Sequence, residues 1–134
     1  MTDRSEQGSV TVFVVGILLA LVVLGGLVFD GGAIIAGHRE ADAEAEGAAR
    51  AAAEQISIPA LRSGQVQLVS NEATSAAQRY LRHYGHNGTV SIEGDTVTVT
   101  VTYPIDMQVL NVIGISTKTV TGTANATAVE GGVP

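Results

Sequence analysis

The chain has 134 residues, a net charge of −6 and no cysteine. This length allows one modest domain, the acidic balance gives no basic footprint for nucleic acid, and the lack of Cys excludes disulfides and thiolate metal sites. Aromatic residues make up 4% of the chain and Trp is absent, so a folded part must build a small core from Val, Ile, Leu and Ala. Domains of this size are marginally stable alone, and the composition therefore favours an assembly component over a free-standing enzyme.

The N-terminal part of the chain is a short polar leader, residues 1–8, followed by an apolar run. Residues 8–29 carry no charge, and a membrane-spanning helix needs about 20 mainly apolar residues. Since backbone amides in lipid must be satisfied within the segment, the run should be α-helical despite its β-branched residues. The pattern predicts a membrane-spanning segment at about residues 10–29. Its main anchoring side chains are expected to be Val10, Phe13, Leu18, Leu21, Leu24 and Phe29.

Two other interpretations of the apolar run are weaker. A cleaved secretory signal has a basic start, an apolar stretch of about 7–15 residues and a nearby small-residue cleavage site. Here Arg4 is offset by Asp3 and Glu6, and the best small-residue site lies far downstream, at residues 31–33. A buried core helix would need other segments to cover an uncharged cylinder of this length, and the chain has none.

The helix is expected to continue past the membrane over residues 9–56. Residues 33–55 are rich in Ala and Glu, which are strong helix formers, and the helix should end before Pro59 because a residue preceding proline disfavours the helical conformation. Small side chains form a narrow stripe that would let other long helices pack closely. Selection for helix propensity alone is the competing explanation of this stripe. The stripe consists of Ala41, Ala45, Ala48, Ala49 and Ala52.

Residues 57–134 are predicted to form a small head domain. A second helix is expected at residues 65–84, where apolar residues recur at threes and fours. Strict alternation of Val or Ala with Thr predicts three strands, with Gly94 and Asp95 in a two-residue hairpin turn. The strands are expected at residues 89–93, 96–103 and 117–129.

The expected fold class is α+β: a long N-terminal transmembrane helix that continues into a head, where the second helix packs on a roughly three-stranded antiparallel sheet. One sheet face should be packed and the other, rich in Thr, should be wet. The last strand presents only small residues between Val120 and Ala128 on its inner face. Because a void there would be costly, we expect the bulky residues of the second helix, including Leu81, to fill it.

No constellation of residues indicates an enzyme. His83 and His86 could offer two metal ligands, but no Cys and no acid nearby in sequence completes the set; a structural or solvated pair is the better interpretation. No serine lies in a nucleophile motif and no phosphate-binding loop occurs. We therefore expect no catalytic residue, no metal, no cofactor and no small-molecule substrate.

Two stretches together resemble a known family. GSVTVFVVGILLALVVLGGLVFDGG at residues 8–32, followed by HREADAEAEGAARAAAEQ at residues 38–55, resembles the N-terminal region of TadE/TadG-like minor pilins of Flp (tight adherence) pilus systems, especially actinobacterial forms. The resemblance implies a pilin-like fold and a structural role in pilus assembly. It further implies a single-pass protein of the bacterial cytoplasmic membrane with an extracytoplasmic head, whose partners are other pilin-like subunits, a prepilin peptidase and membrane lipid.

The resemblance also implies a processing site. In that family a prepilin peptidase cuts after a glycine that ends a short polar leader, which corresponds here to Gly8, with Ser9 as the new N-terminus. Many type IV pilins carry Glu at the fifth residue after the cut, where this chain has Phe13. Its absence removes a charge pair that sets subunit register, so either processing does not occur or the protein is an accessory or minor subunit.

Orientation and the role of the head leave an alternative open. Arg4 precedes the apolar run whereas Arg39 and Arg50 follow it, so the positive-inside rule slightly favours a head on the inside. The resemblance implies the opposite, and we follow it because one or two arginines are a weak signal. The alternative function is a single-pass membrane protein whose extracytoplasmic head binds a ligand or partner without entering a filament.

Overall fold

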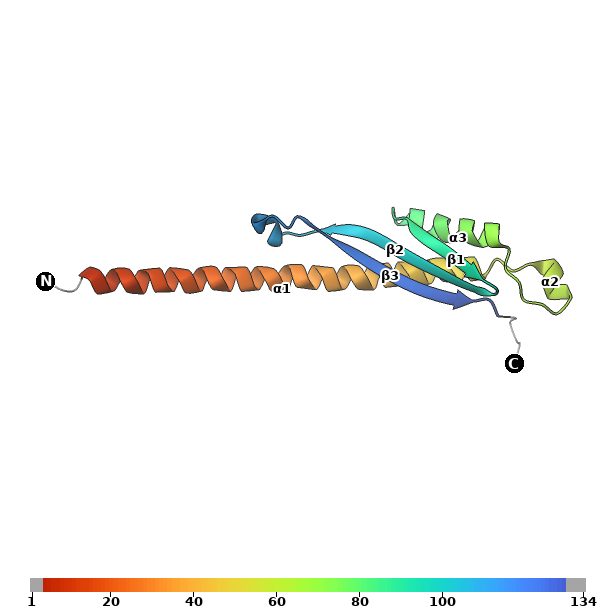
Figure 1. Cartoon of the computed structure of the whole chain (residues 1–134), viewed down its shortest axis with the longest axis horizontal. Coiled ribbons are helices and arrows are strands. Elements are labelled where there is room, and N and C mark those ends of the chain that lie inside the picture. Colours follow the sequence, from red (N-terminus) through yellow and green to blue (C-terminus); the bar gives the residue numbers. More distant parts are fainter. Residues whose placement is uncertain (1–3, 130–134) are drawn as a thin grey trace.

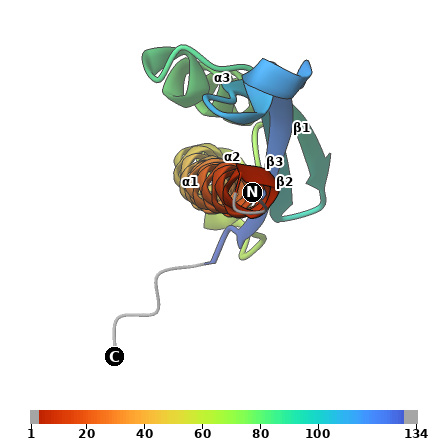
Figure 2. The same ribbon diagram turned by 90° about the vertical axis from the view of Figure 1, so that its left-hand side faces the viewer.

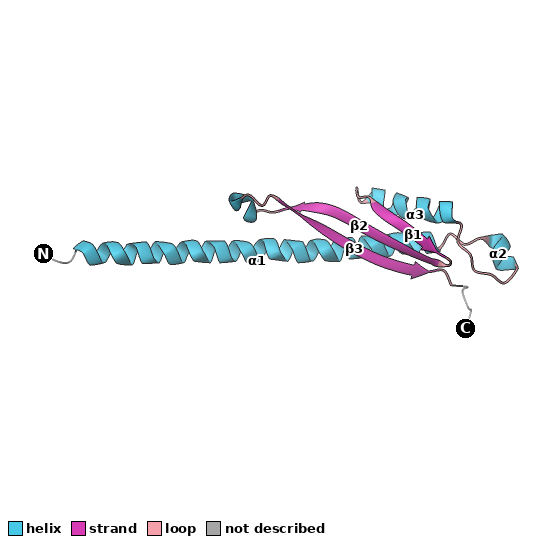
Figure 3. Cartoon of the chain, in the orientation of Figure 1, coloured by secondary structure: helices cyan, strands magenta, loops and turns pink. Residues whose placement is uncertain are grey.

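The computed structural model describes residues 4–129, with side chains from residue 8 onward; residues 1–3 of the expected leader and 130–134 of the expected head lie outside this part. A long helix has an N-terminal half that stands free, while a small head packs against one side of its C-terminal half (Figure 1). The elements, coloured by type in Figure 3, are helices α1 (Arg4–Ala53), α2 (Ile58–Arg62) and α3 (Ser70–His83), strands β1 (Gly88–Glu93), β2 (Thr96–Asp106) and β3 (Thr117–Thr127), and a short 3-10 helix η1 (Leu110–Ile113).

The head contains one antiparallel sheet in the order β1-β2-β3, which confirms the expected α+β class. The tight turn between β1 and β2 places Gly94 at φ 65°, a conformation that glycine adopts without steric cost. Val97, Val99 and Val101 of the central strand are fully buried, whereas their threonine neighbours face outward as the alternation predicted.

β2 runs farther than predicted. We expected it to end at Pro104, but it continues to Asp106, and Pro104 pairs with Thr119 of β3. β1 pairs with β2 only as far as Val101. The last part of β2 is therefore an edge, where proline is tolerated because no second neighbour needs its missing N–H.

The layers are arranged differently from the prediction. The second half of α1 packs on β3 and β2, while α3 packs on α1 and β1; Figure 2 views this arrangement along α1. The small inner face of β3 is thus covered by α1, not by α3. Gly122 is the point of closest approach, since a methyl group there would overlap the backbone of Ala41 and Asp42.

The segment between α1 and α3 is more ordered than the expected connector. Ser57 caps the short helix α2 by accepting a hydrogen bond from the Ala60 N–H, with Pro59 in its first turn. Residues 65–69, predicted as helix, are not helical, and Leu68 forms an isolated bridge with Ile56. α3 therefore starts later than expected, and Gly85, at φ 79°, follows its C-terminal end.

Candidate functional site

The N-terminal half of α1 is a helix without a partner in the chain. Its large apolar side chains from residue 10 to residue 29 are between 44% and 76% exposed, and they point in all directions around the axis. A helix that is apolar all round is normally buried in a core or in a membrane. Within the described residues, α1 is the one helix long and apolar enough to cross a membrane, and almost none of its most apolar stretch is buried.

The residues expected at the processing site and in the anchor all lie in this free half. Gly8 and Ser9 are exposed in α1, and nothing from another element lies near Gly8. The expected anchor residues are between 56% and 68% exposed, so none is used by the head. They are Val10, Phe13, Leu18, Leu21, Leu24 and Phe29.

Asp30 lies near the point where the head begins to contact α1. Its side chain is fully buried, and its two carboxylate oxygens accept hydrogen bonds from the backbone N–H groups of Gln108, Val109 and Leu110 at 3.0, 3.0 and 2.6 Å. These donors lie at the start of η1, so a negative charge is well placed there. Asp30 thus fastens the β2–β3 connection to α1.

One turn before Asp30, Gly26 makes room for the same connection. Gly26 is buried, and a methyl group there would overlap the side chain of Val109. Nothing from another element lies within 4 Å of a methyl group built at Gly25, Gly31 or Gly32. Of the four glycines around this point, Gly26 is thus the one required by packing.

The alanine stripe of α1 packs inside the chain. All five alanines are fully buried, and four of them belong to one hydrophobic core together with Leu81, Val97 and Val99. The chain's own sheet and α3 occupy the surface that we expected to receive neighbouring helices, so subunit contacts need another surface. The stripe consists of Ala41, Ala45, Ala48, Ala49 and Ala52.

A polar cluster joins α1 to the segment between α3 and β1. Glu44 is 4% exposed, and one of its oxygens lies 2.8 Å from Nδ1 of His86. The His86 ring stacks on Tyr103 at 3.9 Å between ring centroids, and the Tyr103 hydroxyl donates to the Gly37 carbonyl at 3.2 Å. Burial, together with Glu40 and Glu44, raises the pKa of Tyr103.

This cluster was missed because Glu44 and His86 are far apart in sequence. The second oxygen of Glu44 is buried and has no hydrogen-bond partner among the described residues. In the same part of the chain, no group of three or more His, Cys, Asp or Glu side chains could hold a metal ion. The cluster therefore links α1 to the head.

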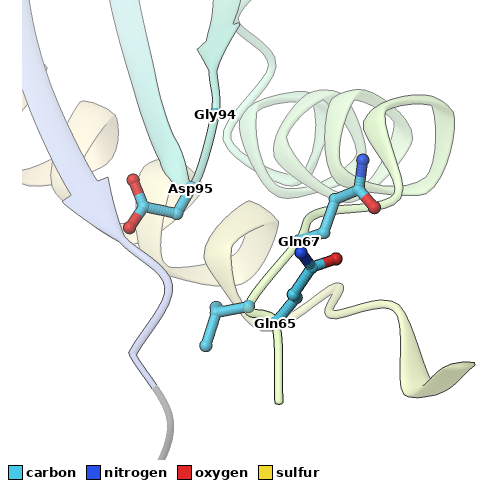
Figure 4. A pocket seen from close by; sticks show the side chains of 5 residues that line it. Gln65, Gln67, Gly94 and Asp95 are labelled. Carbon is cyan, nitrogen blue, oxygen red and sulfur yellow. The ribbon is translucent and has the colours of Figure 1, made fainter. Parts of the chain in front are cut away.

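An open hollow lies at the end of the head far from the free half of α1. It is lined by Gln65, Val66, Gln67, Gly94 and Asp95. Figure 4 shows the side chains of Gln67 and Asp95 pointing away from one another. Because its polar groups do not converge on one point, this hollow lacks the arrangement that binds or transforms a small ligand.

The comparison with protein families identifies the segment that carries the free helix. Residues 8–55 match the model described as putative Flp pilus-assembly TadE/G-like. Over this segment the chain is similar to that family. No curated protein and no solved structure matched the chain. The matched segment covers α1 from Gly8 to its end, whereas α3 and the sheet lie outside it.

The match has a direct functional meaning. A TadE/G-like Flp pilus-assembly segment indicates a pilus-assembly subunit with a structural role and interactions with other pilus components. Together with the exposed apolar half of α1, it indicates a single-pass protein anchored in a membrane. The residues in the match that touch the head, Asp30 and Glu44 among them, serve to hold the head on the helix.

Proposed function

We propose that this protein is a minor subunit of a Flp-type pilus, anchored in the bacterial cytoplasmic membrane with its head on the extracytoplasmic side. The observation that carries the proposal is the free apolar half of α1 inside a TadE/G-like segment. Soluble monomers rarely expose contiguous apolar patches larger than a few hundred Å². A helix that exposes bulky aliphatic groups on every side over residues 10–29 is stabilised by lipid or by the helices of other subunits.

The free half of α1 is also the proposed surface for subunit contacts. Since the alanine stripe is covered by the chain's own head, neighbouring pilin-like subunits would pack along residues 10–29. Gly16 and Gly25 are exposed there with open space beside them, and glycines let helix backbones approach closely in a membrane.

Processing by a prepilin peptidase is the remaining part of the proposal. Cleavage after Gly8 would release the polar leader and make Ser9 the N-terminus. Phe13 then occupies the position where many pilins carry Glu. Without that carboxylate the subunit lacks the charge pair that sets register in the main filament, which supports a minor role.

Intact-mass measurement of the chain purified from membranes of cells that contain a prepilin peptidase tests this proposal. We expect a mature chain that begins at Ser9. Gly8→Val should retain the leader, while the matched control Gly16→Val, a substitution at another exposed glycine of α1, should still be cut.

Two results would count against the proposal. One is a retained leader in cells whose peptidase cuts a known prepilin. The other is a cut chain that is absent from sheared pilus fractions and does not crosslink to any pilus subunit. The second outcome would favour the alternative, a membrane-anchored protein whose head binds a ligand or partner outside a filament.

A further inference from the structure

The connection between β2 and β3 reaches back along α1 to the edge of the free apolar half. Asp30 holds its backbone at residues 108–110, and Val109 lies against Gly26. Figure 1 shows η1 extending beyond the sheet alongside α1, toward the N-terminus. The tip of the head is therefore level with the end of the uncharged run of α1.

This tip exposes aliphatic side chains and carries no charge. Val112 is 86% exposed, Ile113 is 71% exposed and Ile115 is 46% exposed. No charged residue occurs between Asp106 and Lys118. Ile58, Tyr84 and Val129 are also exposed in the described head, but they lie apart in the chain, whereas the three aliphatic residues of the tip lie within four consecutive positions.

Many backbone N–H groups of the tip are already hydrogen-bonded within the chain, as an environment with little water requires. The N–H groups of residues 108–110 donate to Asp30. Those of Met107, Val112, Gly114 and Ile115 donate to carbonyl groups within the connection, at 2.8 to 3.1 Å. Satisfied backbone groups are the main requirement for a segment that enters lipid, and the same bonds compensate the buried charge of Asp30.

The position of the tip agrees with a bilayer boundary. If the apolar core begins near residue 8, about 20 helical residues at ~1.5 Å each cross its thickness of about 30 Å. Gly26 then lies just inside the far edge of the hydrocarbon, and Asp30 lies at the headgroup level. The tip contacts Gly26 and is hydrogen-bonded to Asp30.

We infer that residues 109–115 form a second membrane contact, in which Val112, Ile113 and Ile115 enter the headgroup–acyl boundary of the leaflet on the head side. This inference rests on the proposed membrane anchor. Lipid is favoured over a protein partner because one turn of 3-10 helix with three apolar side chains is far smaller than a stable protein interface. Two attachment points would limit how the head tilts and rotates about α1.

Fluorescence quenching of single-cysteine variants tests the inference directly. The natural chain has no cysteine, so Val112→Cys, Leu21→Cys and Gln65→Cys each give one labelling position for a polarity-sensitive fluorophore. All three positions are exposed, and substitution there should leave the fold intact. The full chain is placed in lipid nanodiscs at one chain per disc, with spin labels attached to the lipids either near the headgroup or deep in the acyl chain.

The expected pattern differs at the three positions. The label at residue 112 should emit at shorter wavelength than the label at residue 65. Headgroup-level spin labels should quench it more strongly than deep spin labels do. The label at residue 21 should be quenched most by deep spin labels. The label at residue 65, at the far end of the head, should respond to neither.

The other outcomes separate the tip from the anchor. If residue 21 is quenched but residue 112 behaves like residue 65, the tip contact is wrong and the anchor stands. If residue 21 is not quenched by either lipid, the proposed anchor fails and the inference fails with it. A short-wavelength emission at residue 112 that lipid does not quench, and that grows with the number of chains per disc, would show a second copy as the occupant and overturn the lipid contact.

Discussion

The two halves of α1 form one continuous helix, yet they differ in the size and in the burial of their side chains. Residues 10–29 present bulky side chains that are largely exposed, whereas the five alanines of the stripe between residues 41 and 52 are fully buried. The first half has no large apolar side chain enclosed by the chain itself. One face of the second half is covered by β2, β3 and α3.

The difference shows how side-chain size decides what a helix can pack against. Small side chains on α1 meet small side chains on β3, and at Gly122 the helix backbone touches the strand. Bulky side chains could not come so close, and in the proposed membrane those of the first half would be stabilised by apolar surroundings outside the chain. Gly26 and Asp30 lie at the boundary between the exposed first half of α1 and the second half, which packs on the head.

The largest effect should come from removing a side chain that closes the head over the buried half. Leu81 of α3 is fully buried in the core that includes the alanines, so Leu81→Ala should lower the free energy of unfolding by about 2–5 kcal/mol. The matched change Leu21→Ala, in the free half, should alter it by less than about 0.5 kcal/mol. Denaturant unfolding in detergent micelles, followed by tyrosine fluorescence, measures both. Equal losses would contradict the division of α1 into two halves.

A smaller loss of stability should follow from a substitution that pushes α1 away from β3. Gly122→Ala should lower the free energy of unfolding by about 1–3 kcal/mol because the added methyl group overlaps the α1 backbone. In Gly32→Ala the methyl group enters open space, and stability should stay the same or rise by up to about 1 kcal/mol. The same unfolding assay checks the pair. A tolerated alanine at position 122 would mean that the close approach is not needed.

Asp30 offers a test of the junction between the halves. Asp30→Ala leaves three N–H donors without their acceptor and should cost about 1–3 kcal/mol, with much faster hydrogen exchange of the amides at residues 108–110. Asp42→Ala, also in α1, removes one exposed hydrogen bond of 3.3 Å to Thr123 and should have little effect. Hydrogen exchange measured by mass spectrometry or NMR reports both. Unchanged exchange in Asp30→Ala would show that the connection is held by packing alone.

The smallest expected effect concerns alkaline pH. Burial and the nearby Glu40 and Glu44 raise the pKa of Tyr103, so the folded state favours the protonated phenol. The resulting stability is present below the unfolded pKa of about 10 and is lost as pH rises through the folded value. Tyr103→Phe should remove this part of the decline, while losing about 1 kcal/mol at neutral pH with the bond to Gly37.

Tyr80 provides the internal check on that prediction. Its pKa is raised by its hydrogen bond with Tyr84 and by burial, so a residual loss of stability above pH 10 should remain in Tyr103→Phe. Unfolding curves recorded from pH 7 to pH 11 give the comparison. A decline of the same size in both proteins would remove Tyr103 as a contributor.

Periodic patterns made much of this molecule predictable. An uncharged run long enough to cross a bilayer, the Ala- and Glu-rich continuation of the helix, and the alternating strands are all local properties, because each side chain's direction follows from a period of 3.6 or 2. The predicted strands at residues 89–93 and 117–129 lie within two residues of β1 and β3. The anchor residues follow from the same local pattern and the processing site from the family resemblance alone; both stay predictions.

What tertiary structure decided was which surfaces meet. The sequence showed an alanine stripe on the long helix and a last strand whose inner face has only small residues, but it did not show what covers either. In the fold, these two surfaces pack against each other. The same holds for Asp30 and for Glu44, whose partners lie 78 to 80 and 42 residues away along the chain. Contacts at such separations depend on the path of the whole chain and leave no periodic signal in the sequence, so only the assembled fold brings those residues together.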